Sequence, residues 1–438
     1  MSKPMRETQA IQLSRRTLLG AGVAAGLLSS GPAAATALPA RPGVAPSKLA
    51  ADEEFWRAVA IQYRTPADIV QLENGNWGVM SQPVLAAYER YQRKVNEQGS
   101  YYVRREYGQD LEAVRAKVAV ALGVAADEIA LTRGATEALQ ALIGGYNKLR
   151  PGDAVLYADL DYDSMQAAMN WLRDRRGVEV IRISLPEPAT HQGLIDAYAA
   201  AFAAHPRIRL VLLTHLSHRT GLVLPIKEIV ALARANSADA IVDSAHAWGQ
   251  IDFKIQDMGV HFVGLNLHKW MGAPVGVGAL YVKRERIADI DPFMANDEVP
   301  IVDIRARVHS GTANFAAFLA VPDALDFHAT VGTPAKEARL RHLRDLWAER
   351  LRGRGRLEIL TPEDRRLHGG ITSFRLRDRR SAAENSAVAK DLLDRFGIFT
   401  VHRTGVAAGA CVRVTPSVFN SEADVQKLAV ALEKIAVG

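Results

Sequence analysis

Lys269 and Asp243 are the residues of this chain whose types and surroundings indicate covalent chemistry. Lys269 follows His268 in a glycine-rich turn, and Asp243 comes at the end of a short apolar run. A lysine amine can form an imine with an aldehyde cofactor, and a carboxylate can keep a pyridine nitrogen protonated. The pair therefore predicts a site for pyridoxal 5'-phosphate (PLP). Each residue alone has a simpler explanation, because most lysines are solvated and an aspartate often caps a helix.

The elements that would position these residues follow from the alternation of apolar and amphipathic stretches. Strands are predicted at 154–157, 178–183, 208–213, 240–242 and 279–282, with helices at 164–173 and 224–235 between them. Such alternation indicates right-handed crossovers and a mainly parallel sheet. Ligands of such sheets bind beyond the carboxyl ends of the strands. Four candidate residues follow predicted strands directly or closely, namely Thr136, Tyr162, His218 and Asp243.

Gly134-Ala135-Thr136 joins an apolar strand to an Ala- and Leu-rich helix. The free backbone N–H groups and positive dipole at a helix start favour a phosphate, and the Thr136 hydroxyl adds a donor. An ordinary helix cap is the alternative. The turn that contains Thr312 has the same small-residue character before a helix and is a second candidate anion site.

Several other residues could contact a cofactor or substrate. Tyr162 could stack on a pyridine ring, and His218 could reach the phenolic oxygen of the cofactor. Arg413 alternates with apolar neighbours and could bind a substrate carboxylate, or it could form a structural salt bridge. The turn containing Asn76 and Trp77 could cover the substrate, although Trp77 could equally anchor the loop on the core. No metal site is predicted, and a structural role is expected for His215.

Composition narrows the class of protein. The chain has 438 residues, of which 48% are hydrophobic and 23% charged, which is typical of a soluble globular protein. The formal net charge is +6 without a long basic run, so nucleic acid is not an expected partner. Cys411 is the only cysteine, which excludes an intrachain disulfide and a cysteine-rich zinc site.

The N-terminal segment is predicted to be an export signal. Ser14–Gly20 contains twin arginines before a weakly hydrophobic stretch, and Ala35-Thr36-Ala37 suits a signal peptidase. This resembles a Tat signal, which predicts export of the folded protein by the Tat translocase to the periplasm. The stretch is too short and glycine-rich for stable membrane insertion. The expected divisions are a signal peptide at 1–37, a linker and helix at 38–70, a large PLP-binding domain at 71–332 and a small α+β domain at 333–438.

Together these motifs resemble the class V aminotransferase group of fold-type I PLP enzymes, and within it the isopenicillin N epimerase-like proteins. The segments that carry the resemblance are Gly134-Ala135-Thr136, Asp243-Ser244-Ala245-His246, His268-Lys269, Ser310-Gly311-Thr312 and Arg413-Val414-Thr415-Pro416. The resemblance implies an α/β fold with a mainly parallel sheet, helices on both faces and a small C-terminal domain. It also implies a homodimer whose active sites are shared between the subunits.

The resemblance assigns a role to each matching residue. Lys269 would carry the cofactor and then shuttle a proton, and Asp243 would pair with the pyridine nitrogen. Arg413 would bind the carboxylate of an amino substrate. The remaining residues that would contact PLP are Gly134, Ala135, Thr136, Tyr162, His218, His246, Asn266 and His268, with Thr312 coming from the partner subunit.

Several reactions are compatible with these residues. Return of a proton to the substrate implies epimerisation, its delivery to the cofactor implies transamination, and loss of a substituent implies elimination. A cysteine desulfurase needs a nucleophilic cysteine on a mobile loop, and Cys411 is predicted to lie on a strand. Tailoring of a siderophore in the periplasm and non-catalytic ligand binding are further alternatives.

Overall fold

The computed structural model describes residues 38, 40–294, 296 and 299–437. The predicted export signal at 1–37 lies outside the described residues. Within the described part of the chain, no helix has the length and apolar character needed to cross a membrane.

A seven-stranded sheet organises the first two thirds of the chain. Its spatial order is β2 (Ile129–Thr132), β8 (Gly278–Val282), β7 (Phe262–Asn266), β6 (Asp239–Asp243), β5 (Ile208–Thr214), β3 (Ala154–Ala158) and β4 (Glu179–Ile183). Only β8 runs antiparallel to its neighbours, β2 and β7, and all other pairs are parallel. The predicted mainly parallel sheet is therefore confirmed.

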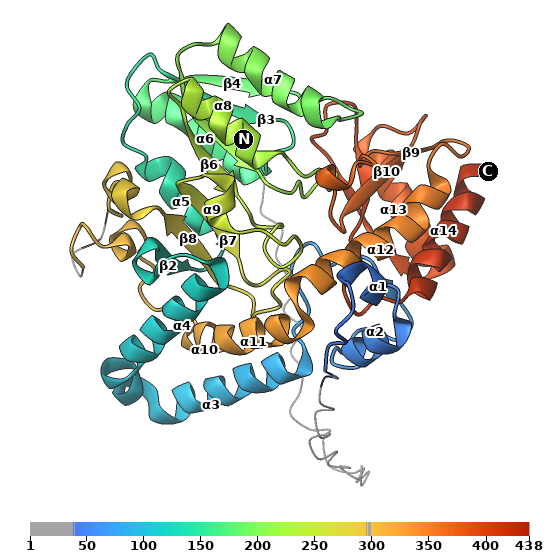
Figure 1. The fold of residues 1–438 in the computed structure, drawn as a ribbon, viewed down its shortest axis with the longest axis horizontal. Helices are drawn as coiled ribbons and strands as arrows, with labels where there is room; N and C mark the ends of the chain where they lie inside the picture. The colour runs from blue at the N-terminus through green and yellow to red at the C-terminus, as the bar shows by residue number, and fades with distance from the viewer. Residues whose placement is uncertain (1–37, 39, 295, 297–298, 438) are drawn as a thin grey trace, which may run out of the picture. The chain divides into compact units, whose positions relative to one another are not determined.

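Helices cover both faces of this sheet (Figure 1). Successive residues of a strand point to opposite faces, so each strand contributes to two cores. Val211 and Val242 pack in one core with α4 (Tyr107–Leu122), α7 (His191–Ala204) and α8 (Ile226–Ala235). Leu212 and Ile241 pack in the other with α5 (Ala135–Gly145) and α6 (Asp163–Arg176). The prediction of helices on both faces is confirmed.

The C-terminal part of the chain has its own four-stranded antiparallel sheet. The order is β12 (Val401–Arg403), β13 (Cys411–Val414), β10 (Thr372–Leu376) and β9 (Leu357–Ile359). Helices α12 (Thr333–Leu351), α13 (Ala382–Phe396) and α14 (Glu422–Val437) pack with it around a separate core, orange to red in Figure 1. This agrees with the expected α+β character, while the domain boundaries stay a prediction.

The segment before residue 71 belongs structurally with the C-terminal part. Here β1 (Val70–Gln71) pairs in parallel with β11 (Ile398–Phe399), and Trp56 packs with Leu340 of α12. The remaining elements are α1 (Pro46–Leu49), α2 (Glu53–Ala60), α3 (Gln82–Arg105), α9 (Ile255–Met258), α10 (Phe315–Leu319), α11 (Val321–Val331) and the short 3-10 turns η1 (Ala126–Glu128), η2 (Arg284–Asp289), η3 (Ile304–Arg307) and η4 (Arg365–Leu367).

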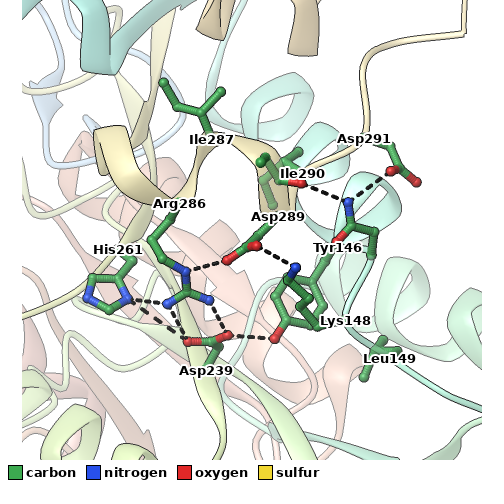
Figure 2. Close-up of polar contacts among 12 residues, drawn as sticks. Tyr146, Lys148, Leu149, Asp239, His261, Arg286, Ile287, Asp289, Ile290 and Asp291 are labelled. Atoms are coloured by element: carbon green, nitrogen blue, oxygen red, sulfur yellow. Dashed lines mark hydrogen bonds and ion pairs between the residues drawn. The ribbon is translucent and has the colours of Figure 1, made fainter. Parts of the chain in front are cut away.

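A polar network fastens η2 to the amino ends of β6 and β7 (Figure 2). Arg286 forms a two-point ion pair with Asp239 (2.6 and 3.0 Å) and also contacts Asp289. The Tyr146 hydroxyl donates to Asp239 (2.6 Å), and Arg286 Nη1 donates to Nδ1 of His261 (2.6 Å). This network holds the end of the sheet opposite to the carboxyl ends of β5, β6 and β7.

Candidate active site

A cavity of about 710 Å³ lies beyond the carboxyl ends of the central strands. Residues from the loops of the large sheet and from β12 and β13 line it together. The predicted site residues among them are Asn76, Gly134, Ala135, Thr136, Tyr162, His218, Asp243, His246, Asn266, His268, Lys269 and Arg413. Trp77 and Thr312, also predicted, are exposed and are not among the residues that line this cavity.

Lys269 enters the cavity from the turn after β7. Its Nζ lies 3.0 Å from Nε2 of His246, and the indole N–H of Trp270 donates to Nδ1 of the same imidazole (3.3 Å). Burial lowers the pKa of Lys269 to about 8, although nearby Asp243 opposes this shift. Near that pH a large fraction of the side chain is the neutral amine, which is the form that reacts with an aldehyde.

Asp243 is the last residue of β6 and is buried. Its Oδ1 accepts a hydrogen bond from the backbone N–H of Ala245 (2.9 Å). Burial raises the pKa of the Asp243 carboxyl, which means that its charged form lacks sufficient compensation in the cofactor-free protein. A protonated pyridine nitrogen placed against this carboxylate would provide that compensation.

The start of α5 forms a close cradle with the turns around it. Asn266 Oδ1 accepts a hydrogen bond from the backbone N–H of Ala135 (2.7 Å), and His268 Nδ1 donates to the carbonyl of Val277 (2.9 Å). A Cβ at Gly134 would lie 3.2 Å from Asn266 Oδ1 and 3.1 Å from the His268 ring, so a side chain here would press on both residues of the cradle. Helix dipole, free N–H groups and lack of obstruction suit a phosphate.

Three aromatic rings line the cavity between this cradle and the C-terminal sheet. Tyr162 meets His218 edge to face with ring centroids 5.2 Å apart, and His218 stacks loosely over His246 at 6.3 Å. Tyr162 is 38% exposed, so one side of its ring remains accessible. The cavity thus offers a lysine, a buried carboxylate, a phosphate cradle and an aromatic wall, and these residues fit PLP.

Arg413 is already engaged by another residue of the chain. Its Nη2 contacts both carboxylate oxygens of Glu73 (2.5 and 2.8 Å), and its Nη1 donates to the carbonyl of His218 (2.7 Å). Arg403 Nη2 lies 3.5 Å from the same carboxylate. The structural salt bridge considered from the sequence is therefore present, and binding of a substrate carboxylate by Arg413 stays a prediction.

Three residues of the site were not among the sequence predictions. Glu73 is the one acid in the Asn- and Gly-rich turn before Gly78, Arg403 is the last residue of β12, and Trp270 follows Lys269 directly. Adjacency to the lysine was a signal for Trp270. No sequence pattern indicated that Glu73 would face Arg413, because 339 residues separate the two positions in the chain.

Two residues with alternative roles have structural environments. Cys411 is fully buried, its thiol lies 3.8 Å from the carbonyl of Arg219, and burial raises its pKa to about 11. His215 lies 3.4 Å from the Ser244 hydroxyl and packs edge to face on Phe253. In the described part of the chain, no three His, Cys, Asp or Glu residues are grouped as metal ligands.

Comparison with known proteins agrees with this geometry. Isopenicillin N epimerase of Streptomyces clavuligerus is 28% identical over 386 residues, which are 84% of this chain and 95% of the relative. Cysteine desulfurase of Pectobacterium atrosepticum is 24% identical, covering 80% of this chain and 88% of the relative.

Solved structures show the same fold. The cysteine desulfurase CsdA of Escherichia coli superposes with a TM-score of 0.73 at 20% identity, covering 86% of this chain and 97% of that one. The cystine C–S lyase C-DES, solved with its product cysteine persulfide, gives 0.72 at 22% identity and covers 84% and 97% of the two chains. Residues 79–428 match the family described as aminotransferase class-V, and the chain accordingly belongs to this family of PLP-dependent enzymes.

Proposed function

We propose that the protein acts at the amine-bearing carbon of an amino acid or a related amino metabolite, in a reaction of the epimerase or aminotransferase type. The observation that carries the proposal is that Lys269, Asp243 and the start of α5 line the same cavity. Two isopenicillin N epimerases match 84% and 87% of this chain, and this similarity supports the same reaction class.

Each residue of the site would have a distinct role. PLP, when bound, supplies an aldehyde for the amine of the substrate and a ring that withdraws electrons from the bonds of the attached carbon. The cradle formed by Gly134, Ala135, Thr136, Asn266 and His268 would hold the phosphate. Asp243 would keep the pyridine nitrogen protonated. Lys269, whose pKa burial lowers to about 8, would remove and return the proton at the substrate carbon.

Elimination is the second candidate reaction, and persulfide formation on the protein has little support. Cys411 is buried, and burial raises its pKa to about 11, so it lacks the exposed thiolate that attack on a substrate sulfur requires. An eliminating lyase needs only a base at Lys269, and the likeness in fold to C-DES keeps this reaction open. A binding protein without catalysis would not require a lysine of lowered pKa beside a buried carboxylate.

Exchange of the substrate α-proton in heavy water tests the proposal before the product is known. The purified holoenzyme is incubated with L- and D-amino acids and cystine, and the loss of the α-proton signal is followed by NMR. We expect exchange with at least one substrate, abolished in Lys269→Ala and retained in the control Lys390→Ala, which alters an exposed lysine of α13. Exchange that persisted in Lys269→Ala would remove the lysine from its role.

Products then separate the reaction types. Appearance of the opposite enantiomer indicates epimerisation, a keto acid with consumption of an amino acceptor indicates transamination, and pyruvate with a sulfur product from cystine indicates elimination. Activity restricted to large amine-bearing peptides would support a role in siderophore tailoring.

We also propose export of the folded enzyme to the periplasm by the Tat translocase. The support is the order of twin arginine, weakly hydrophobic stretch and small-residue cleavage site in residues 14–37. Replacing Arg15 and Arg16 by Lys should leave the protein in the cytoplasmic fraction. An unchanged distribution between fractions would overturn this proposal without affecting the chemistry.

A homodimer is the third part of the proposal. Met294, Ile301 and Val302 are 94%, 67% and 77% exposed, and a partner subunit would shield such apolar side chains. Thr312 would then reach the partner's phosphate cradle. Sedimentation should give a dimer for the wild type and a lower mass for Val302→Asp, and Thr312→Val should weaken PLP binding. A monomeric wild-type holoenzyme would exclude the shared site.

A further inference from the structure

Trp270 makes a directional contact at the candidate catalytic lysine. Its indole N–H donates to Nδ1 of His246 (3.3 Å), and the other ring nitrogen of His246 lies 3.0 Å from Nζ of Lys269. We infer that Trp270 is a positioning residue: it selects the His246 tautomer with the proton on Nε2, and that proton favours the neutral amine of Lys269.

The Trp270 N–H is a donor and cannot accept a hydrogen bond. The Nδ1 atom of His246 must therefore present its lone pair to the indole. In a neutral imidazole the proton then resides on Nε2. Trp270 and His246 are 4% and 5% exposed, so water competes poorly for either ring nitrogen.

Because Nε2–H of His246 points at Nζ of Lys269, the lysine must accept this hydrogen bond with its lone pair. Only the neutral amine has a lone pair. Were the proton on Nδ1 instead, Nε2 would accept a hydrogen bond from the ammonium ion and would favour the charged lysine. The tautomer of His246 thus shifts the equilibrium between the neutral and the protonated amine of Lys269.

Backbone contacts hold the turn that carries the indole. Trp270 follows Lys269 directly in the chain, so the same turn positions the indole and the amine. The buried Lys336 donates to the backbone carbonyl of Trp270. The turn also contacts the loop before α3, since the N–H of Gly78 donates to the carbonyl of His268 (2.8 Å).

Other charged groups also act on His246 and Lys269. Asp243 at the end of β6 and Glu73 after β1 favour the ammonium, whereas Arg403 on β12 and Arg413 on β13 disfavour it. His218 after β5 and both arginines lower the pKa of His246, for which burial is the largest cause. None of these groups changes when Trp270 is replaced by Phe, so a comparison of the two proteins isolates the indole N–H.

The first test determines the tautomer of His246 without a catalysed reaction. The full-length protein is stripped of cofactor after growth on isotope-labelled histidine, and the two ring nitrogens of His246 are identified by NMR through the signals missing in His246→Gln. The inference predicts a neutral ring protonated at Nε2 in the wild type and loss of this preference in Trp270→Phe. A wild-type ring protonated at Nδ1 would overturn the inference, even if Trp270→Phe failed to fold.

The second test reads the charge of Lys269. Rates of PLP uptake by the cofactor-free protein are followed by absorbance across a pH series, which reports the fraction of neutral amine. Trp270→Phe should raise the apparent pKa of Lys269 by about one unit, the change expected when a hydrogen bond to the ammonium replaces one to the amine. The matched control is Trp56→Phe in α2. It removes another buried indole N–H, which donates to the Leu49 carbonyl (2.7 Å).

A double-mutant cycle separates this role from simple packing. In the His246→Gln background, Trp270→Phe should no longer change the apparent pKa, because the indole acts through the imidazole. An equal shift in both backgrounds, or none in the single variant, contradicts the inference. The inference rests on the proposed role of Lys269, but the tautomer measurement does not. Cofactor attached elsewhere would refute that role and leave the tautomer result standing.

Discussion

Lys269 and Lys336 together show that burial alone does not identify a catalytic lysine. Burial lowers the pKa of Lys269 to about 8 and that of Lys336 to about 7. Lys336, however, donates to the Trp270 carbonyl and lies 3.5 Å from Nδ1 of His328. Lys269 lines the large cavity together with Asp243. The surroundings, and not the size of the shift, distinguish the structural lysine from the reactive one.

Arg403 is the residue whose replacement best tests how the cavity attracts carboxylates. Burial, followed by repulsion from Arg413, lowers its pKa to about 10, and its Nε is buried without a hydrogen-bond partner. Glu73 lies 2.5 Å from Nη2 of Arg413 but 3.5 Å from Nη2 of Arg403, so Arg403 is the less tightly engaged of the two arginines and the better candidate to bind a substrate anion. Arg403→Gln should therefore raise the KM for a carboxylate-bearing amine by about tenfold, since a charged hydrogen bond contributes about 1.5–3 kcal/mol.

Arg133→Gln is the matched control for this measurement. Arg133 also lines the cavity, but it is paired with Glu137 (2.9 Å) and its side chain is 60% exposed. We expect little change in KM for this variant. Equal effects of the two substitutions would mean that the cavity attracts anions only through its overall charge.

The sequence predicted Asp243, Lys269 and Arg413 from their local context and missed Glu73, whose role depends on the folded structure. Asp243 and Lys269 could be recognised because each follows an apolar run that had to be a buried strand. Arg413 was recognised as an inward-facing charge, with a salt bridge as an alternative. Its partner Glu73 could not be identified, because the parallel bridge between Glu73 and Thr415 that aligns them forms only in the folded protein.

At the scale of elements, the loop before α3 fits against the turn of Lys269 without space for a side chain. A Cβ at Gly78 would lie 1.9 Å from the carbonyl oxygen of Lys269. Gly78→Ala should lower the free energy of unfolding by about 1–3 kcal/mol, as overpacking does, and should weaken PLP binding because the turn must move. Denaturant unfolding and PLP titration measure both effects.

Gly108→Ala is the control for this substitution. Gly108 lies in α4, and a Cβ there meets nothing within 4 Å. Alanine should stabilise the helix by about 0.5–1 kcal/mol, because it loses less backbone entropy than glycine. If both variants were as stable as the wild type, the loop would be able to withdraw from the lysine turn.

The network at the amino ends of β6 and β7 predicts a dependence of stability on pH. Burial, followed by the charge of Arg286, lowers the pKa of His261 below its ordinary value of 6.5. The unfolded chain then binds a proton at this residue more readily than the folded protein. The stability contributed by neutral His261 is complete above pH 6.5 and is lost as the pH falls through 6.5 towards the lower folded pKa.

The variant His261→Asn isolates this contribution from other buried histidines. Thermal midpoints measured between about pH 5 and pH 8 should fall less steeply on the acid side for the variant than for the wild type. Parallel curves would mean that protonation of His261 beside Arg286 costs the folded protein no stability (Figure 2).

Strands and helices were predicted well where an apolar pattern is sufficient. The strands at 208–213 and 279–282 correspond to β5 and β8. Helix α7 was not predicted, since its run of alanines has little amphipathic contrast. The pairing of β1 with β11 joins residues far apart in the sequence, and no local pattern indicates it.

At the scale of the whole molecule, Arg219 links the start of α6, beside the large sheet, to the loop after β12 of the C-terminal sheet. It is 1% exposed, donates to Asp163 at the start of α6 (2.6 Å) and also donates to the Thr404 carbonyl after β12. A Cβ at Gly405 would lie only 1.2 Å from its Nη1, so the loop is shaped around the guanidinium. Arg219→Gln should destabilise the protein by about 2 kcal/mol, because the buried guanidinium loses its hydrogen bonds while its partner Asp163 is 71% exposed and can be solvated.

The exposed pair of Lys390 and Asp394 provides the contrast. These side chains are 72% and 52% exposed, so Lys390→Ala should change stability by less than about 0.5 kcal/mol. Calorimetry should also show whether Arg219→Gln separates unfolding into two transitions. A single unchanged transition would mean that other contacts hold the two sheets together.

The attachment point of the cofactor tests the central claim most directly. Borohydride reduction of the holoenzyme makes the bond between cofactor and amine permanent, and peptide mapping by mass spectrometry then locates it. We predict one pyridoxyl group per chain, on Lys269. Attachment to Lys336 or to a surface lysine, with Lys269 unmodified, would contradict it.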